Sequence, residues 1–181
     1  IKMYLNGTEI ASASSTTNAS NTTLKIGTNW GGYITTGFLS NIRISNTART
    51  ISAVPSSLLA ADANTVFLVN FTNAGIYDAT SKNDLETVGN AQISTSVKKF
   101  GTGSMAFDGS GDYLLAPNRN AFAFGTGDYT IELFVRFSAI SRVYRIFAID
   151  TGTGVLTTDT SNNIRWLGSV FTPSPALAAN T

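Results

Sequence analysis

The chain has 181 residues, of which 43% are hydrophobic and only 13% charged, and this balance excludes a disordered chain. Its 12 basic and 11 acidic residues leave a net charge of +1, and beyond Lys98-Lys99 and the Arg142/Arg145 pair no basic cluster is present, which argues against nucleic acid as the main partner. Cysteine and histidine are absent, which excludes a disulfide framework, a thiolate zinc site and a Ser-His-Asp triad.

The first fifty residues carry strand and turn signals. Residues 2–10 predict a hairpin, because Asn6-Gly7 supplies the positive φ angles that a two-residue type I′ turn needs. The segments expected after it are a polar loop (11–22), a strand (23–26), a loop with an aromatic tip (27–32) and a strand covered on one face (38–44). No run of about 18 apolar residues occurs anywhere, so no membrane insertion is expected.

The middle of the chain interrupts this strand pattern. Residues 47–64 contain Pro55 and many small residues, and we expect a connector there with one short helical turn around Ser57–Ala61. A buried strand is expected over 65–71. The further strands predicted after it cover 85–88, 91–94, 104–107, 113–116, 128–137, 145–149 and 163–167, with a loop-like tail from 173 to 181.

The clearest strand signal is that of residues 128–137. Its apolar residues fall on one face at alternate positions, namely Ile131, Leu133, Val135 and Phe137. Short strands separated by turn signals at intervals of roughly ten residues are typical of a sandwich or barrel. The sequence therefore predicts an all-β protein.

Two stretches resemble one family. Residues 98–137, KKFGTGSMAFDGSGDYLLAPNRNAFAFGTGDYTIELFVRF, resemble the N-terminal half of a concanavalin A-like, laminin-G-like domain, with Phe134 where the family usually has Trp. Residues 1–50 resemble the C-terminal half of the same family through IKMYLNGTEIAS and LSNIRISNTAR. The intervening region, 47–71, is similar to the junctions between tandem copies in phage tail and other virion adhesins. The resemblance implies an antiparallel jelly-roll β-sandwich.

The two halves occur in reversed order. The implied organisation is a C-terminal half over 1–50, a linker over 51–64 and an N-terminal portion over 65–181. Three arrangements stay open: a window across two tandem domains, a circularly permuted single sandwich, or a chain that takes missing strands from a neighbouring copy. If the chain is ordered alone, we expect its two parts to pack on each other, because a half-sandwich would expose an apolar face.

A glycan is the first ligand that the residues suggest. Neutral sugars stack on an aromatic ring while amides and backbone groups hold their hydroxyls, and the loop with Asn29, Trp30 and Tyr33 offers such a set beside two glycines. The alternative is that Trp30 caps the end of the sandwich. Trp166 is a further candidate, although its strand pattern also fits a core position.

Calcium is the one cofactor that the residues suggest. Asp108, Ser110 and Asp112 present oxygens at alternate positions, as Ca²⁺ loops do, yet the same segment also fits a plain hairpin turn. The resemblance implies a structural calcium near the first and last strands. Its candidates here are Asn70 or Asp78, but Ser40-Asn41 stands where an acidic pair is common.

No enzymatic activity is expected. The chain has three glutamates, Glu9, Glu86 and Glu132, and lacks the Glu-x-Asp-x-Glu spacing of glycoside hydrolases with this fold. Asp84 and Glu86 would share one strand face in a polar stretch, and a solvated carboxylate is the plainer interpretation of each.

These observations give an ordered set of functional expectations. The first is a carbohydrate-recognition or adhesion module of a larger extracellular or virion-surface protein, such as a phage tail fibre, with a cell-surface polysaccharide and neighbouring copies as partners. The second is a purely structural virion or filament module. A glycan-active hydrolase comes third, because this fold hosts all three classes.

Overall fold

The computed structural model describes residues 1–14, 22–28, 34–72, 75–117, 120–149, 155–166, 169–173 and 176–179. The strands in this part of the chain are β1 (Lys2–Leu5), β2 (Thr8–Ser12), β3 (Leu24–Ile26), β4 (Thr36–Ser45), β5 (Thr65–Val69), β6 (Glu86–Val88), β7 (Gln92–Ser94), β8 (Ser104–Asp108), β9 (Tyr113–Ala116), β10 (Thr130–Phe137), β11 (Arg145–Ala148), β12 (Val155–Thr158), β13 (Ile164–Trp166) and β14 (Ser169–Phe171). A 3₁₀ turn, η1 (Asn120–Phe122), is the helical element among them. None of the described helices is long and apolar enough to cross a membrane.

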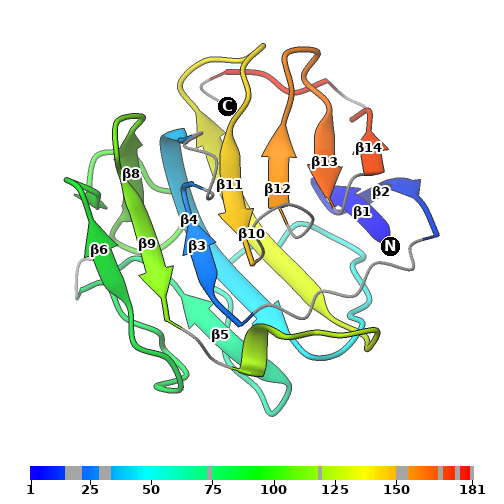
Figure 1. The fold of residues 1–181 in the computed structure, drawn as a ribbon, viewed down its shortest axis with the longest axis horizontal. Helices are drawn as coiled ribbons and strands as arrows, with labels where there is room; N and C mark the ends of the chain where they lie inside the picture. The colour runs from blue at the N-terminus through cyan, green and yellow to red at the C-terminus, as the bar shows by residue number, and fades with distance from the viewer. Residues whose placement is uncertain are drawn as a thin grey trace.

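The strands form two facing antiparallel layers (Figure 1). The front sheet has the order β14-β13-β12-β11-β3-β9-β6. The back sheet has the order β10-β4-β8-β7, and β5 pairs with the other half of the long strand β4 on the same side as β8. The prediction of an all-β antiparallel sandwich is confirmed.

Residues from the N-terminal part lie in the middle of both layers. Strand β3 pairs with β11 on one side and with β9 on the other. Strand β4 pairs with β10 on one side and with β8 and β5 on the other. Residues 24–45 therefore complete one sandwich with residues 65–171, while the domain limits and the relation to tandem copies stay predictions.

The N-terminal hairpin forms at the expected turn. Asn6 and Gly7 have φ angles of 50° and 77°, as a type I′ turn requires. A side chain at Gly7 would lie 2.6 Å from the backbone carbon of Ala53, so the hairpin tip packs closely on the connector. Strands β1 and β2 form a two-stranded sheet of their own, seen behind β13 and β14 in Figure 1.

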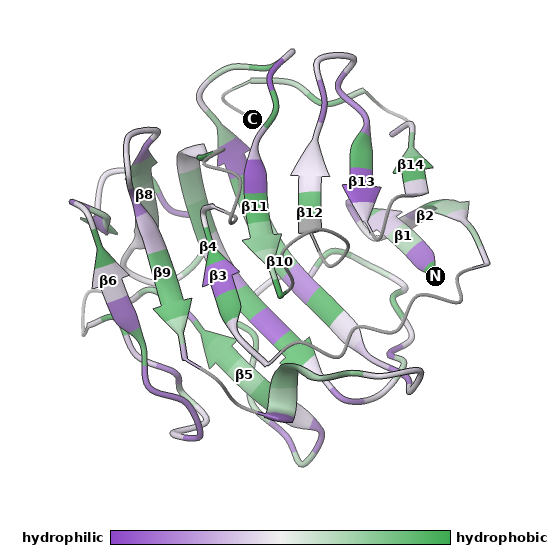
Figure 2. Cartoon of the chain, in the orientation of Figure 1, coloured by the Kyte–Doolittle hydropathy of each residue, from purple (hydrophilic) through white to green (hydrophobic). Residues whose placement is uncertain are grey.

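The hydrophobic core lies between the two layers. Figure 2 shows strands in which strongly hydrophobic positions are interrupted by hydrophilic ones, while the connecting loops contain residues of both kinds. On β4 the inward-facing residues Leu39, Ile42 and Ile44 are completely buried, and Phe67, Phe107 and Phe147 from three other strands pack in the same core. Because buried apolar area is the main favourable term in folding, these central positions hold the sandwich together.

The connector between β4 and β5 is fixed to the outer side of the back sheet. The amide of Asn46 donates to the carbonyl of Asn64 at 3.0 Å, so its two ends are held together. The short helical turn predicted around Ser57–Ala61 is wrong, because this segment contains no helix. The physical reason is that both backbone groups of Leu59 bond to side chains and not to the backbone of a helical turn. Its amide donates to Asn41 Oδ1, and its carbonyl accepts from Asn70 Nδ2.

An ion pair closes the connector on itself and makes its docking sensitive to acid. Arg49 Nη2 donates to both carboxylate oxygens of Asp62 at 2.8 Å, and these hydrogen bonds lower the pKa of Asp62 from 3.8 to about 2. A carboxyl whose pKa is lower in the folded state stabilises that state above the unfolded pKa and loses this contribution as the pH falls through the folded pKa. The contribution of Asp62 is thus expected to fade between about pH 4 and pH 2.

Thermal melting of the wild type and of Asp62→Asn tests this expectation. The melting temperature of the wild type should exceed that of the variant at pH 5, and the difference should shrink towards pH 2. Asp128→Asn, at an exposed carboxyl, serves as the control. A difference between wild type and Asp62→Asn that stays constant over this range would contradict the role assigned to the ion pair.

Candidate functional site

Of the four predicted glycan-binding residues, the structure describes only Trp166. Asn29, Trp30 and Tyr33 lie outside the described residues. Trp166 is 4% exposed and packs in the core beside Phe147. Its indole Nε1 donates to the hydroxyl of Tyr129 at 2.9 Å, so its polar group is already satisfied inside the protein. Trp166 therefore presents little surface to a ligand.

The predicted calcium residues form a self-contained turn. Asp112 is buried, and its carboxylate accepts from the backbone amides of Asn90 at 2.9 Å and Asp108 at 3.0 Å. Asp108 is exposed, and its carboxylate accepts from the amide of Ser110, the main cause that lowers the pKa of Asp108. The carboxylates thus stabilise the turn between β8 and β9, while calcium binding at Asp108, Ser110 and Asp112 stays a prediction. Within the described residues no three His, Cys, Asp or Glu side chains gather as metal ligands would.

The carboxylate of Asp78 is buried and accepts several hydrogen bonds. It is 3% exposed, and its two oxygens accept hydrogen bonds from the loop that follows it and from strand β5. The donors are the amides of Leu68, Thr80 and Asn83, the hydroxyl of Thr80 and the side-chain amide of Asn83, at 2.6–3.1 Å. This arrangement fastens residues 78–83 to β5, which is a structural role.

Polar side chains also meet on the outer side of β4 and β5, under Leu59. Asn41 has a φ angle of 54° at an irregularity in the pairing of β4 with β10, and it is fully buried. Three buried side-chain atoms in this region have no hydrogen-bond partner among the described residues: Ser40 Oγ, Asn41 Nδ2 and Asn70 Oδ1. Ser40 Oγ and Asn41 Nδ2 can donate hydrogen bonds and Asn70 Oδ1 can accept one, which is the set of groups that an ordered water requires. The site does not suit a cation, because the amide nitrogen of Asn41 is a donor and not a ligand for a metal ion.

The glutamates do not assemble a pair for acid–base chemistry. Glu132 on β10 is held by Arg43 on β4, whose Nε donates to Glu132 Oε2 at 2.7 Å, and their side chains are 15% and 14% exposed. Glu9 pairs with Lys2 on the hairpin, and this hydrogen bond lowers the pKa of Glu9. Glu86 lies on the short strand β6 opposite Leu115. Glu9, Glu86 and Glu132 thus lie on three different strands, and the absence of enzymatic activity stays a prediction.

A small hollow that the sequence did not suggest lies in the loop after β5. Its volume is about 30 Å³, room for one small group, and it is lined by Asn70, Phe71, Thr72, Gly75, Tyr77 and Ala79. Tyr77 is 53% exposed, and among the described residues it is the one aromatic side chain with most of its surface in solvent. An exposed tyrosine beside a threonine hydroxyl and a glycine backbone provides groups that a polar ligand with an apolar face requires.

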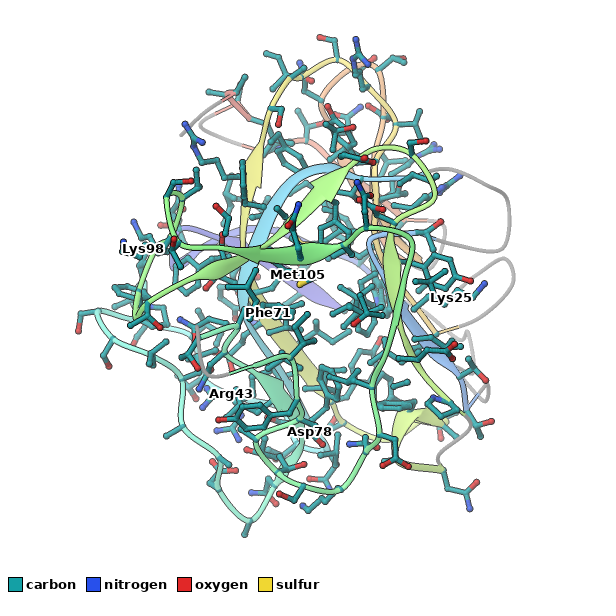
Figure 3. All side chains as sticks on the ribbon, turned by 90° about the vertical axis from the view of Figure 1, so that its left-hand side faces the viewer. Lys25, Arg43, Phe71, Asp78, Lys98 and Met105 are labelled. Atoms are coloured by element: carbon teal, nitrogen blue, oxygen red, sulfur yellow. The ribbon has the colours of Figure 1, made fainter. Side chains whose placement is uncertain are left out.

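The backbone around this hollow is strained. Phe71 has a φ angle of 51° although it is bulky and buried, and such left-handed geometry costs on the order of 1–3 kcal/mol. Figure 3 shows Phe71 between Met105 and Asp78, so its ring is fixed in the core while the chain turns out into the loop. Only the structure reveals this feature, because a Phe-Thr pair has no signature of a left-handed turn.

Comparison with protein-family models, curated proteins and solved structures finds no match for this chain.

Proposed function

We propose that this sandwich is a carbohydrate-recognition or adhesion module of a larger virion or cell-surface protein. The observation that carries the proposal is the exposed ring of Tyr77 at the rim of a hollow with polar lining groups. The resemblance of residues 98–137 and 1–50 to concanavalin A-like, laminin-G-like domains supports it, because that fold often presents glycan sites on its loops.

The chemistry of the hollow favours a neutral sugar. None of the described side chains that line it is charged, and Thr72 offers a hydroxyl group to sugar hydroxyls. The C–H face of a pyranose would lie on the Tyr77 ring while one exocyclic group enters the hollow. The strain at Phe71 supports a functional loop, since strained backbone clusters at ligand sites.

A glycan array tests the proposal. The wild type should bind a subset of neutral glycans, and Tyr77→Ala should weaken that binding by about tenfold, because a stacking contact contributes on the order of 1 kcal/mol or more. Tyr4→Ala, on the N-terminal hairpin, is the matched control and should bind as the wild type does. Trp30→Ala should be run beside them, since Trp30 is the ring predicted from the sequence.

The same array separates the remaining expectations. Loss of binding in Trp30→Ala with none in Tyr77→Ala would move the site to residues 29–33. Loss on adding a chelator would support the calcium prediction at Asp108 and Asp112. A folded chain that binds no glycan would contradict the proposal and favour the second function, a structural module of a virion or filament.

The structural alternative has an observation of its own. Strand β10 is long and pairs on one side only among the described strands, and such an edge is a ready template for another strand. A module that spaces or joins subunits would use a surface of this kind.

A further inference from the structure

Aromatic and basic side chains meet on the outer face of the back sheet. On β10, Phe134 and Arg136 point to this face, because Val135 between them packs on the core and side chains alternate along a strand. Arg136 lies 6.0 Å from the centre of the Phe38 ring on β4, which is its direct partner in the pairing of the two strands. The ring of Phe134 meets the ring of Phe100 edge to face, with 5.3 Å between their centres.

The loop between β7 and β8 extends this set of side chains. It lies over the same face, where the hydroxyl of Ser104 donates to the carbonyl of Val97. Lys99 in this loop lies 6.0 Å from the centre of the Phe100 ring. Figure 3 shows the neighbouring Lys98 at the margin of the molecule on the side of the back sheet, opposite Lys25 of the front sheet. The contacts form one continuous series, here called the cation–aromatic row, which consists of Lys99, Phe100, Phe134, Arg136 and Phe38.

The cation–aromatic row is open to solvent and carries positive charge only. Lys99 is exposed, and the other four members are partly exposed. Among the described residues neither Lys99 nor Arg136 has an acidic partner. The carboxylate on the same face of β10, that of Glu132, is neutralised by Arg43, and Asp108 at the end of β8 accepts hydrogen bonds within its own turn. An anion that reaches the row therefore meets two cations whose charge is not yet balanced.

The position of the row favours one kind of anionic partner. Strand β4 under the row is paired on both sides, so its backbone offers no free hydrogen-bonding groups to a peptide strand. A folded protein surface over the row would bury Lys99 and Arg136, at a cost that only well-aligned carboxylates offset. A hydrated chain of sugar rings avoids both limits. Its C–H faces lie on the phenylalanine rings, while its carboxylates reach the ammonium and the planar guanidinium from solvent.

We infer that the cation–aromatic row is a binding site for an acidic polysaccharide, a polymer of sugar rings that carry carboxylate groups. Lys99 and Arg136 hold carboxylates of different sugar residues, since two phenylalanine rings lie between them in the row. The rings of Phe100, Phe134 and Phe38 support the sugar rings. This inference does not rest on the hollow beside Tyr77, whose proposed ligand is neutral and lies in a different part of the chain.

Fluorescence anisotropy with labelled hexagalacturonate at low salt tests the inference, and its methyl ester is the uncharged control. We expect saturable binding of the acid, at least about tenfold tighter than that of the ester. Lys99→Gln and Arg136→Gln should each weaken it by about threefold, and the double variant by about tenfold. Phe100→Leu keeps both charges and should weaken it by about threefold. Arg142→Gln, at an exposed cation outside the row, should bind as the wild type does.

The inference would be overturned by a folded protein that shows no saturable binding, by equal binding of acid and ester, or by a double variant that binds as the wild type does. Hexaglutamate that binds as tightly as hexagalacturonate would also overturn it, because the row would then recognise charge on a peptide as well as on a sugar. Tyr77→Ala should leave the affinity for hexagalacturonate unchanged. Failure of this test leaves the result for neutral glycans unaffected, so the two proposals are distinguishable.

Discussion

Replacing Asp78 with alanine is expected to lower the free energy of unfolding by about 3–5 kcal/mol. The carboxylate is 3% exposed and accepts five hydrogen bonds from Leu68, Thr80 and Asn83. Its removal leaves buried amides without acceptors, and each unpaired buried group costs on the order of 1–3 kcal/mol. Urea denaturation followed by tryptophan fluorescence measures the change.

The matched control is Asp128→Ala, at an exposed carboxylate, which should change the free energy of unfolding by less than about 0.5 kcal/mol. Thr80→Val offers a second test, because it removes one of the five donors and leaves the carboxylate in place. Its effect should be a fraction of that of Asp78→Ala. An Asp78→Ala protein as stable as the wild type would refute the structural role assigned to this carboxylate.

Replacing Asn41 with alanine is expected to lower the free energy of unfolding by about 2–4 kcal/mol. Two costs combine: the buried amide of Leu59 loses its acceptor, Oδ1 of Asn41, and alanine must adopt a φ angle of 54°. The first is on the order of 1–3 kcal/mol, and the second about 1–2 kcal/mol.

Asn41→Gly separates these two costs. Glycine tolerates the left-handed angle but offers no acceptor to Leu59, so this variant should recover the second cost alone. Equal stability of the alanine and glycine variants would show that the backbone angle contributes nothing. A wild-type value for both would contradict the view that Asn41 anchors the connector on β4.

The sequence predicted those elements whose signals are local. Asn6-Gly7 identified the first hairpin, because few other dipeptides adopt two positive φ angles. The alternation of residues 131–137 identified β10, the longest of the edge strands. Strands β12 and β14 were missed, since four and three residues are too few for a period to emerge.

The remaining features depend on contacts between distant residues. The helical turn expected near Ser57 failed because Asn41 and Asn70 take both backbone groups of Leu59, and no local pattern reports this. Tyr77 was not predicted as a site residue, since the exposure of its ring depends on how distant parts of the chain pack and not on the residues beside it. Trp166 was weighed as a ligand contact and lies in the core, where Tyr129 satisfies its indole.

The hydrogen bond between Asn46 and Asn64 affects how the sandwich tolerates insertions in the connector. Because the two ends of the connector meet at one hydrogen bond of 3.0 Å, lengthening the exposed stretch at 56–57, beyond the contact of Ala53 with the hairpin tip, is expected to leave β4 and β5 in place. The entropic cost of closing a longer loop grows only logarithmically, by about 0.6 kcal/mol for each doubling of its length. The connector is therefore the place where we expect inserted sequence, up to the size of a whole domain, to leave the sandwich intact.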